Sequence, residues 1–199
     1  MKLFKKFIKN VDLLLNLSDW CKGSIEYFYN GPPDRYILRL NRSFPEGWNG
    51  VDITDGKLRK EIIGMPPNNI AFPDGIEFIK NKLINKFKIE SSDRPDVFMS
   101  LHKKGAFIQP HKHFPKKKYH DLRFNIFINK TKGGDPVVSS ETLKNHKLFV
   151  DAGDLVVFSA NNMHYSTPVE EGERIVLSYG FFVRDEYVEK LFNKNEKIH

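Results

Sequence analysis

Cysteine is almost absent from the chain, because Cys21 is the one cysteine among its 199 residues. A single cysteine excludes an intrachain disulfide, so we expect a cytoplasmic protein kept in a reducing environment. The sequence also lacks any run of about 18 consecutive apolar residues, which excludes a transmembrane helix of ordinary length. It contains no internal repeat and no low-complexity tract, and its length suits a single domain, 1–199.

The N-terminal residues lack the continuous apolar segment of a secretory signal. Lys9 and Asp12 interrupt that segment, and no small-residue cleavage site follows. Apolar side chains at helical spacing instead predict an amphipathic helix packed on the domain. These side chains are Leu3, Phe4, Phe7, Ile8 and Val11. Attachment of this helix to a membrane surface is the less favoured interpretation, and we expect no membrane partner.

The charge is unbalanced, with 32 Lys and Arg against 25 Asp and Glu and a formal net charge of +7. A basic balance favours acidic partners or polyanions in general, but it identifies none of them. A solvated lysine-rich surface explains the same composition more simply, so we do not expect a nucleic-acid partner. The hydrophobic fraction of 40% and the 17 Phe are ample for a core.

Residues 1–95 are predicted to form a mixed α/β part that buttresses the rest of the domain. The segment 36–40 is a candidate strand, and 65–69 is a loop. A helix should begin at Asp74, with Glu77 three residues later to complete a capping box. Its buried face repeats at helical spacing. That face comprises Ile76, Ile79, Leu83, Ile84 and Phe87.

From residue 97 onward the pattern changes to short strands separated by turns. The eight predicted strands are 97–103, 106–113, 122–129, 137–138, 147–150, 155–159, 163–169 and 174–183. A pattern of this kind is typical of an all-β sandwich or jelly roll. A short closing helix should follow over 185–194. The predicted fold class is therefore mainly β with flanking helices, built on a core over 97–183.

Two histidines one residue apart, His111 and His113, are the first candidate site. Alternate side chains of a strand point to the same face, so both imidazoles can reach one point. Imidazole is a ligand for Fe, Zn, Cu and Ni. The chain has seven histidines in all, so an ordinary solvated loop is the alternative. A third imidazole, that of His164, stands where a distant strand should begin.

The strand predicted over 122–129 carries a second group of polar side chains. Arg123, Asn125 and Phe127 share one face, and Phe124 and Ile126 point the other way. The apolar face belongs in the core. The Arg and Asn face either meets solvent or lines a polar cavity, and its sequence alone leaves both possibilities open.

The C-terminal half carries a longer ordered pattern. Gly153 and Asp154 form a turn before a hydrophobic strand, His164 follows, and then come Pro168 and Val169. Gly172 stands two residues before Arg174, which opens the last strand. Together with the segment 108–111 and a Gly-Gly turn at 133–134, this run resembles Fe(II)/2-oxoglutarate-dependent dioxygenases, in their prolyl-hydroxylase-like or aspartyl-hydroxylase-like branches. The resemblance covers 97–183.

The resemblance implies a double-stranded β-helix with a metal near one open end. His111 matches the first metal ligand and His164 the distal one, so Fe(II) is the implied metal. Arg174 matches the residue that binds the far carboxylate of the cosubstrate 2-oxoglutarate, since a guanidinium can bind a carboxylate bidentately. The family layout also turns Arg123 and Asn125 toward the cavity, where either could contact 2-oxoglutarate or the substrate.

The activity implied is that of an O2-dependent hydroxylase that releases succinate and CO2. Its substrate is a protein side chain, an amino acid or another small metabolite, and the sequence does not choose among them. The residues that would select it lie in 35–69 and 116–121, where no known motif is present.

Position 113 departs from the family pattern, which has Asp or Glu where this chain has His113. Three interpretations remain open. His113 replaces the carboxylate and gives a three-histidine site. It points away, leaving a two-histidine site completed by water. Or Asp121 supplies the missing carboxylate, which its spacing favours least. A site of three imidazoles has no ligand charge to offset the metal.

Two functions of other classes compete with the oxygenase. The first is a cupin-like metalloenzyme, such as a thiol dioxygenase or isomerase, whose three-histidine site does not use 2-oxoglutarate. The second is a non-catalytic jelly-roll binding module with a basic surface around the lysines of 116–118.

Overall fold

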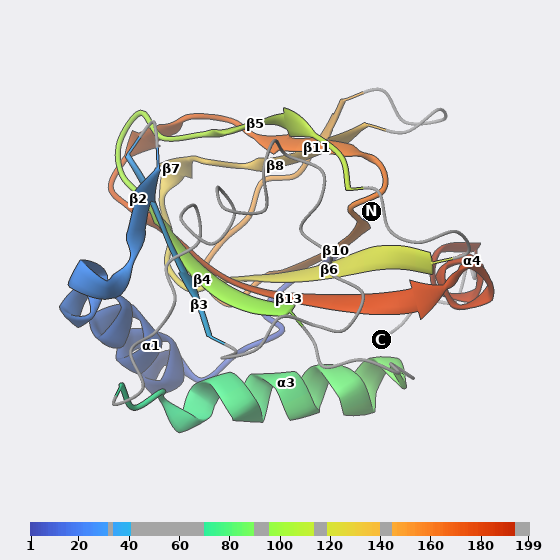
Figure 1. Cartoon of the computed structure of the whole chain (residues 1–199), viewed down its shortest axis with the longest axis horizontal. Helices are drawn as coiled ribbons and strands as arrows, with labels where there is room; N and C mark the ends of the chain where they lie inside the picture. Colours follow the sequence, from blue (N-terminus) through green and yellow to red (C-terminus); the bar gives the residue numbers. More distant parts are fainter. Residues whose placement is uncertain (32–33, 41–69, 90–95, 114–118, 140–144, 194–199) are drawn as a thin grey trace.

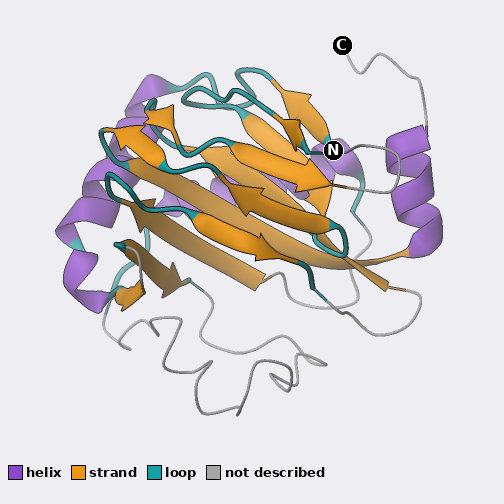
Figure 2. Ribbon diagram, turned by 90° about the horizontal axis from the view of Figure 1, so that it is seen from above, coloured by secondary structure: helices purple, strands orange, loops and turns teal. Residues whose placement is uncertain are grey.

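The computed structural model describes residues 1–31, 34–40, 70–89, 96–113, 119–139 and 145–193. Two antiparallel β-sheets face each other, and a helix covers the outer side of the larger one (Figure 1). Seen from above, the strands of the smaller sheet lie over those of the larger sheet (Figure 2). The arrangement is the jelly roll predicted from the strand pattern.

The larger sheet has seven strands in the order β1-β10-β6-β13-β4-β3-β2. Its strands are β1 (Lys2–Phe4), β2 (Tyr29–Gly31), β3 (Arg35–Arg39), β4 (Asp96–His102), β6 (Tyr119–Phe127), β10 (Leu155–Ser159) and β13 (Arg174–Arg184). Strands from the N-terminal part therefore occupy both edges. The predicted strands over 36–40, 97–103, 122–129, 155–159 and 174–183 are confirmed within a few residues at each end.

The smaller sheet has four strands in the order β5-β11-β8-β9, and β12 pairs with β7 beside it. Their bounds are β5 (Ile108–His111), β7 (Lys132–Gly133), β8 (Pro136–Ser139), β9 (His146–Lys147), β11 (Met163–Ser166) and β12 (Val169–Glu171). The single strand predicted over 163–169 is thus two strands, since Pro168 lacks the N–H that a continuous ladder needs. The strand predicted over 147–150 is shorter, although Val150 still packs in the core.

The N-terminal helix prediction is wrong in position. Residues 2–4 form the edge strand β1, which pairs with β10, and the helix α1 begins only at Val11 (Val11–Gly23). The Asn10 side chain caps α1 by accepting a hydrogen bond from the backbone N–H of Leu13 at 3.0 Å. Phe7 and Ile8 are buried as expected, but in the connection between β1 and α1. A short 3₁₀ helix, Ile25–Tyr27, follows α1.

The helix α3 (Asp74–Phe87) confirms the predicted amphipathic helix and its buried face. The predicted capping box is wrong: Pro73 occupies the cap position, and the cap makes no side-chain hydrogen bond. Pro73 lies in an extended conformation with φ −60°, a value that its ring favours. The closing helix is confirmed as α4 (Asp185–Asn193). None of the helices in the described ranges has the length and apolar composition that a membrane crossing needs.

The two faces of the larger sheet differ in character, and this difference positions the site. The outer face packs on α1 and α3, as in the contact of Phe124 with Phe87 at 5.1 Å between ring centroids. The inner face carries Arg123, Asn125 and Phe127 of β6, and Phe127 packs with Val138 of the smaller sheet. The Arg and Asn face therefore turns toward the smaller sheet rather than to solvent, and Arg123 is buried.

Candidate metal centre

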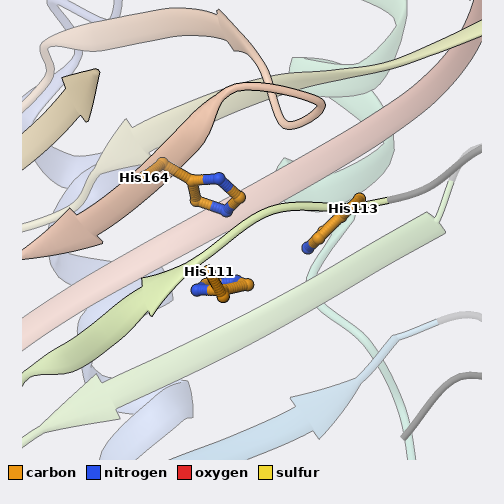
Figure 3. A group of neighbouring side chains, drawn as sticks. All are labelled: His111, His113 and His164. Atoms are coloured by element: carbon orange, nitrogen blue, oxygen red, sulfur yellow. The ribbon is translucent and has the colours of Figure 1, made fainter. Parts of the chain in front are cut away.

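Three histidines from two strands of the smaller sheet and the adjoining chain converge on one point (Figure 3). His111 ends β5 and is the direct cross-strand partner of His164 in β11. His113 follows two residues after His111, where its backbone N–H donates to Ala160 O at 2.7 Å. One ring nitrogen from each lies within 4.8 Å of the others. Sequence-distant strands thus bring together all three predicted metal ligands.

Hydrogen bonds fix the proton of each imidazole on the same nitrogen. His111 Nδ1 lies 2.8 Å from the carbonyl oxygen of Gln109, and His164 Nδ1 lies 2.9 Å from that of Asn162. A carbonyl oxygen only accepts, so each Nδ1 donates and each Nε2 carries a free lone pair. His113 Nδ1 lies 2.5 Å from a carboxylate oxygen of Asp121, so this Nδ1 also donates. This tautomer is the one that a metal-binding imidazole requires.

Desolvation favours the neutral form of two of these rings. Desolvation lowers the pKa of His164 to about 3, and the nearby His111 adds to the effect. Desolvation also lowers the pKa of His111, against the hydrogen bond to Gln109 that raises it. Neutral imidazoles with bare Nε2 atoms are the form in which histidine binds a transition metal. The donor set fits Fe(II), and it also fits other first-row divalent ions.

A buried carboxylate stands behind His113. Asp121 is 1% exposed and also accepts a hydrogen bond from Arg123 Nη2 at 2.7 Å. Burial alone raises the pKa of Asp121, but the charge of Arg123 and the hydrogen bond from His113 outweigh burial and hold the pKa well below its ordinary value. Asp121 is therefore ionised. The metal-ligand cluster of the described residues contains His113 and not Asp121.

Arg174 opens β13 on the inner face of the larger sheet and is 1% exposed. Its Nη2 donates to the carbonyl oxygen of Gly133 at 2.5 Å, and it lies 3.8 Å from Asp135. Its Nε and Nη1 have no hydrogen-bond partner among the described residues. A guanidinium buried with donors to spare is suited to bind an anion, because unpaired buried donors are costly.

Comparison with known proteins finds similarity to hydroxylases and oxygenases. No family model matches it. A 57-residue stretch, 28% of this chain, is 37% identical to 25% of a PKHD-type hydroxylase of Rhizorhabdus wittichii. A match of 160 residues at 21% identity covers 78% of this chain and 64% of a PKHD-type hydroxylase of Cupriavidus pinatubonensis. The chain thus spans less than two thirds of the length of these curated relatives.

Solved structures show the same fold. A prolyl-4-hydroxylase of Pseudomonas putida superposes on the chain with a TM-score of 0.61 at 16% identity, over 92% of both chains. A 2OG-Fe(II) oxygenase family oxidoreductase of Burkholderia pseudomallei gives a TM-score of 0.52 at 17% identity, over 82% of this chain and 76% of the other. The chain is thus similar in part of its sequence to PKHD-type hydroxylases and shares the fold of 2OG-Fe(II) oxygenases. The superposition on the prolyl-4-hydroxylase confirms the predicted double-stranded β-helix.

Arg123 is buried among carboxylates. Its Nη1 and Nη2 donate to Asp96 at 3.2 Å, and its Nη2 also reaches Asp121. The neighbouring Asn125 keeps its Oδ1 buried, without a hydrogen-bond partner in the described residues. Of the two cosubstrate contacts predicted on β6, Asn125 thus has polar capacity to spare, while Arg123 is largely occupied.

Sequence reasoning missed two inner-face residues of β4. His102 lies opposite Arg174 in the strand pairing and is 3% exposed, with its Nε2 unpartnered among the described residues. Asp96 lies at the other end of the same strand and joins Arg123 to Arg39. Alternation along β4 could have placed both on one face. It could not have shown that this face is the inner one.

Other histidines lie outside the cluster. His120 contacts Ser159 Oγ at 2.7 Å and Asp185 at 3.1 Å, and His146 is exposed on β9. The lysines of 116–118, the loop at 65–69 and most of the proposed substrate-selecting segment, 41–69, lie outside the described residues.

Proposed function

We propose that the protein is an Fe(II)- and 2-oxoglutarate-dependent oxygenase that hydroxylates a substrate and releases succinate and CO2. His111, His113 and His164 hold the iron, and Arg174 binds the far carboxylate of 2-oxoglutarate. Asn125, on the same face of the sheet, contacts the cosubstrate or the substrate. The carrying observation is the convergence of three imidazoles, each of which donates from Nδ1 to a protein acceptor, so that Nε2 is the ring atom available to a metal.

The chain's own residues bind and orient the reactants in this scheme. The Gln109 and Asn162 carbonyl groups hold two of the ligand rings, so little reorganisation is needed when a metal enters. Arg174 is fixed by its bond to Gly133, which leaves a preset direction for the cosubstrate carboxylate. When bound, the iron supplies the redox chemistry: one O2 is consumed, one oxygen atom enters succinate and the other hydroxylates the substrate.

A visible charge-transfer spectrum tests the proposal directly. Anaerobic addition of Fe(II) and 2-oxoglutarate to the wild-type protein should produce a band that needs both components. His164→Ala should lose it, and His146→Ala, with an exposed histidine outside the cluster, should retain it. Absence of the band from wild type, together with unchanged metal binding in His164→Ala, would overturn the proposal.

The three-histidine donor set also supports a second candidate, a cupin-like metalloenzyme that does not use 2-oxoglutarate. Arg174→Gln separates the two functions. In the oxygenase it should weaken 2-oxoglutarate binding by about 10- to 100-fold, the usual effect of losing a hydrogen bond to a charged group. In the cupin-like enzyme it should leave metal binding and activity nearly unchanged. Arg184→Gln, an exposed arginine at the far end of the same strand, is the matched control.

The substrate is a protein side chain, an amino acid or another small metabolite, and we assign the reaction to the cytoplasm on the evidence of the single free cysteine. Substrate-stimulated formation of succinate from 2-oxoglutarate, measured across peptides and metabolites, should identify the class. A non-catalytic binding module is the remaining alternative. It would yield no stimulated succinate with any compound and would bind polyanions in a salt-sensitive manner.

A further inference from the structure

We propose that Asp121 is a positioning residue of the metal centre, which supplies from behind His113 the negative charge that a carboxylate ligand would otherwise bring. The proposal rests on the proposed function, because it assumes that the three histidines bind a metal. It concerns one question that the ligand set leaves open, namely how a site without a carboxylate ligand balances the charge of a divalent cation.

The partner of His113 differs in kind from those of the other two ligands. His111 and His164 each donate from Nδ1 to a backbone carbonyl, at 2.8 and 2.9 Å. His113 donates from Nδ1 to the Asp121 carboxylate at 2.5 Å. A carboxylate behind an imidazole makes the ring a more basic and more strongly oriented ligand than a carbonyl does. The one ligand with a carboxylate partner is thus His113, at the position where the superfamily resemblance predicts a carboxylate ligand.

A chain of alternating charges holds Asp121 in place. Arg123 donates to Asp121 at 2.7 Å and to Asp96 at 3.2 Å, and Asp96 lies 3.2 Å from Arg39. The side chains of these four residues are at most 4% exposed. Two buried arginines thus stabilise the two buried carboxylates. Buried carboxylates are retained only with such partners.

Asp121 is not placed to ligate the metal directly. Its Oδ2 accepts from both His113 and Arg123, while its Oδ1 has no hydrogen-bond partner among the described residues. The ligand cluster of those residues excludes it. Asp121 therefore acts on the metal through the His113 ring, and it fixes the ring's tautomer and orientation. The carboxylate thus lies on the far side of the His113 ring from the metal position.

Metal titration of Asp121→Asn tests the role. The apo protein is titrated anaerobically with Co(II), and binding is followed by calorimetry and by the ligand-field absorption bands. We expect a 10- to 100-fold loss of affinity, the usual effect of removing such a partner, and a shift of the bands. Asp185→Asn is the matched control, because Asp185 pairs with His120 at 3.1 Å outside the cluster. Wild-type affinity and bands in Asp121→Asn would overturn the proposal.

A second background separates an effect on the ligand from an effect on the fold. His113→Asp restores a carboxylate ligand and removes the imidazole through which Asp121 acts, so in that background Asp121→Asn should weaken Co(II) binding much less than it does in the wild-type background. An equal loss in both backgrounds would mean that Asp121 acts through general stability, and the proposal would be wrong.

The remaining variants keep the test decisive if Asp121→Asn does not fold. Asp121→Glu keeps a charge for Arg123 but moves it by one methylene, so we expect a several-fold loss of Co(II) affinity and shifted bands. Identical affinity and bands would overturn the proposal. Unchanged Co(II) binding in both His111→Ala and His164→Ala would instead refute the metal site itself, and with it the proposed function.

Discussion

Gly180 lies directly opposite Arg123 in the pairing of β13 with β6, and its missing side chain makes room for the guanidinium. A Cβ at Gly180 would lie 2.7 Å from Arg123 Cζ and 2.8 Å from its Nη1. Arg123 cannot simply swing away, because it is buried and holds both Asp96 and Asp121. Gly180 of β13 therefore makes room for the arginine that holds Asp121 behind His113.

Gly180→Ala should destabilise the protein by about 1–3 kcal/mol, the usual effect of overpacking a buried site. It should also weaken metal binding, because Arg123 must shift from Asp121. Urea unfolding and Co(II) titration measure the two effects. Gly23→Ala is the control, since a Cβ there meets nothing within 4 Å. Wild-type stability and metal affinity in Gly180→Ala would show that the guanidinium is free to move.

His102 makes a pH-dependent contribution to stability. Desolvation, with the charges of Arg35 and Arg174, lowers the pKa of His102 to about 3, against about 6.5 in the unfolded chain. Below pH 6.5 the unfolded state binds a proton that the folded state does not, so stability falls as pH falls toward 3. His102→Asn should remove this part of the loss, at most about 1.4 kcal/mol per pH unit.

The measurement compares the free energy of unfolding of wild type and His102→Asn between pH 7 and pH 4.5, with a chelator present to keep metal out. The wild-type curve should fall more steeply than the variant curve. His146→Asn, an exposed position, should follow wild type. Parallel curves for wild type and His102→Asn would show that His102 does not cause the loss of stability at low pH.

The docking of α3 on the larger sheet depends on its buried face. Leu83 is fully buried there, and Phe78 on the same helix is 57% exposed. Leu83→Ala should cost about 2–5 kcal/mol, because it loses apolar burial and leaves a cavity. Phe78→Ala should change stability by less than about 0.5 kcal/mol. Thermal or urea unfolding measures both, and a larger loss in Phe78→Ala would reverse the assignment of the helix faces.

Cys21 should be unreactive in the folded protein. Its side chain is fully buried in α1, and burial raises the pKa of its thiol to about 12. Since the thiolate is the reactive form, a disulfide reagent at pH 8 should label no thiol in the native state and one after unfolding in denaturant. Rapid labelling of the native protein would show that the α1 packing opens readily.

Local pattern in the sequence was enough for much of the fold. The strands over 155–159 and 174–183 are bounded by turns and rich in β-branched or apolar residues, and α3 shows its buried face in its spacing. The N-terminal segment shows where this reasoning stops. Leu3 and Phe4 fit a helical repeat, yet they form β1 because β10, some 150 residues away, offers a free edge. Pairing across the sheet overrides local preference.

The sequence by itself identified the three histidines that we propose as metal ligands, the place of Arg174 at the start of the last strand, and the alternation that groups Arg123 with Asn125. These depend on chemistry and on the two-residue period of a strand. Only the tertiary structure decided that His113 joins His111 and His164, and that Asp121 lies behind it at 2.5 Å. Distances between sequence-distant side chains come from strand register and burial, which no local spacing encodes.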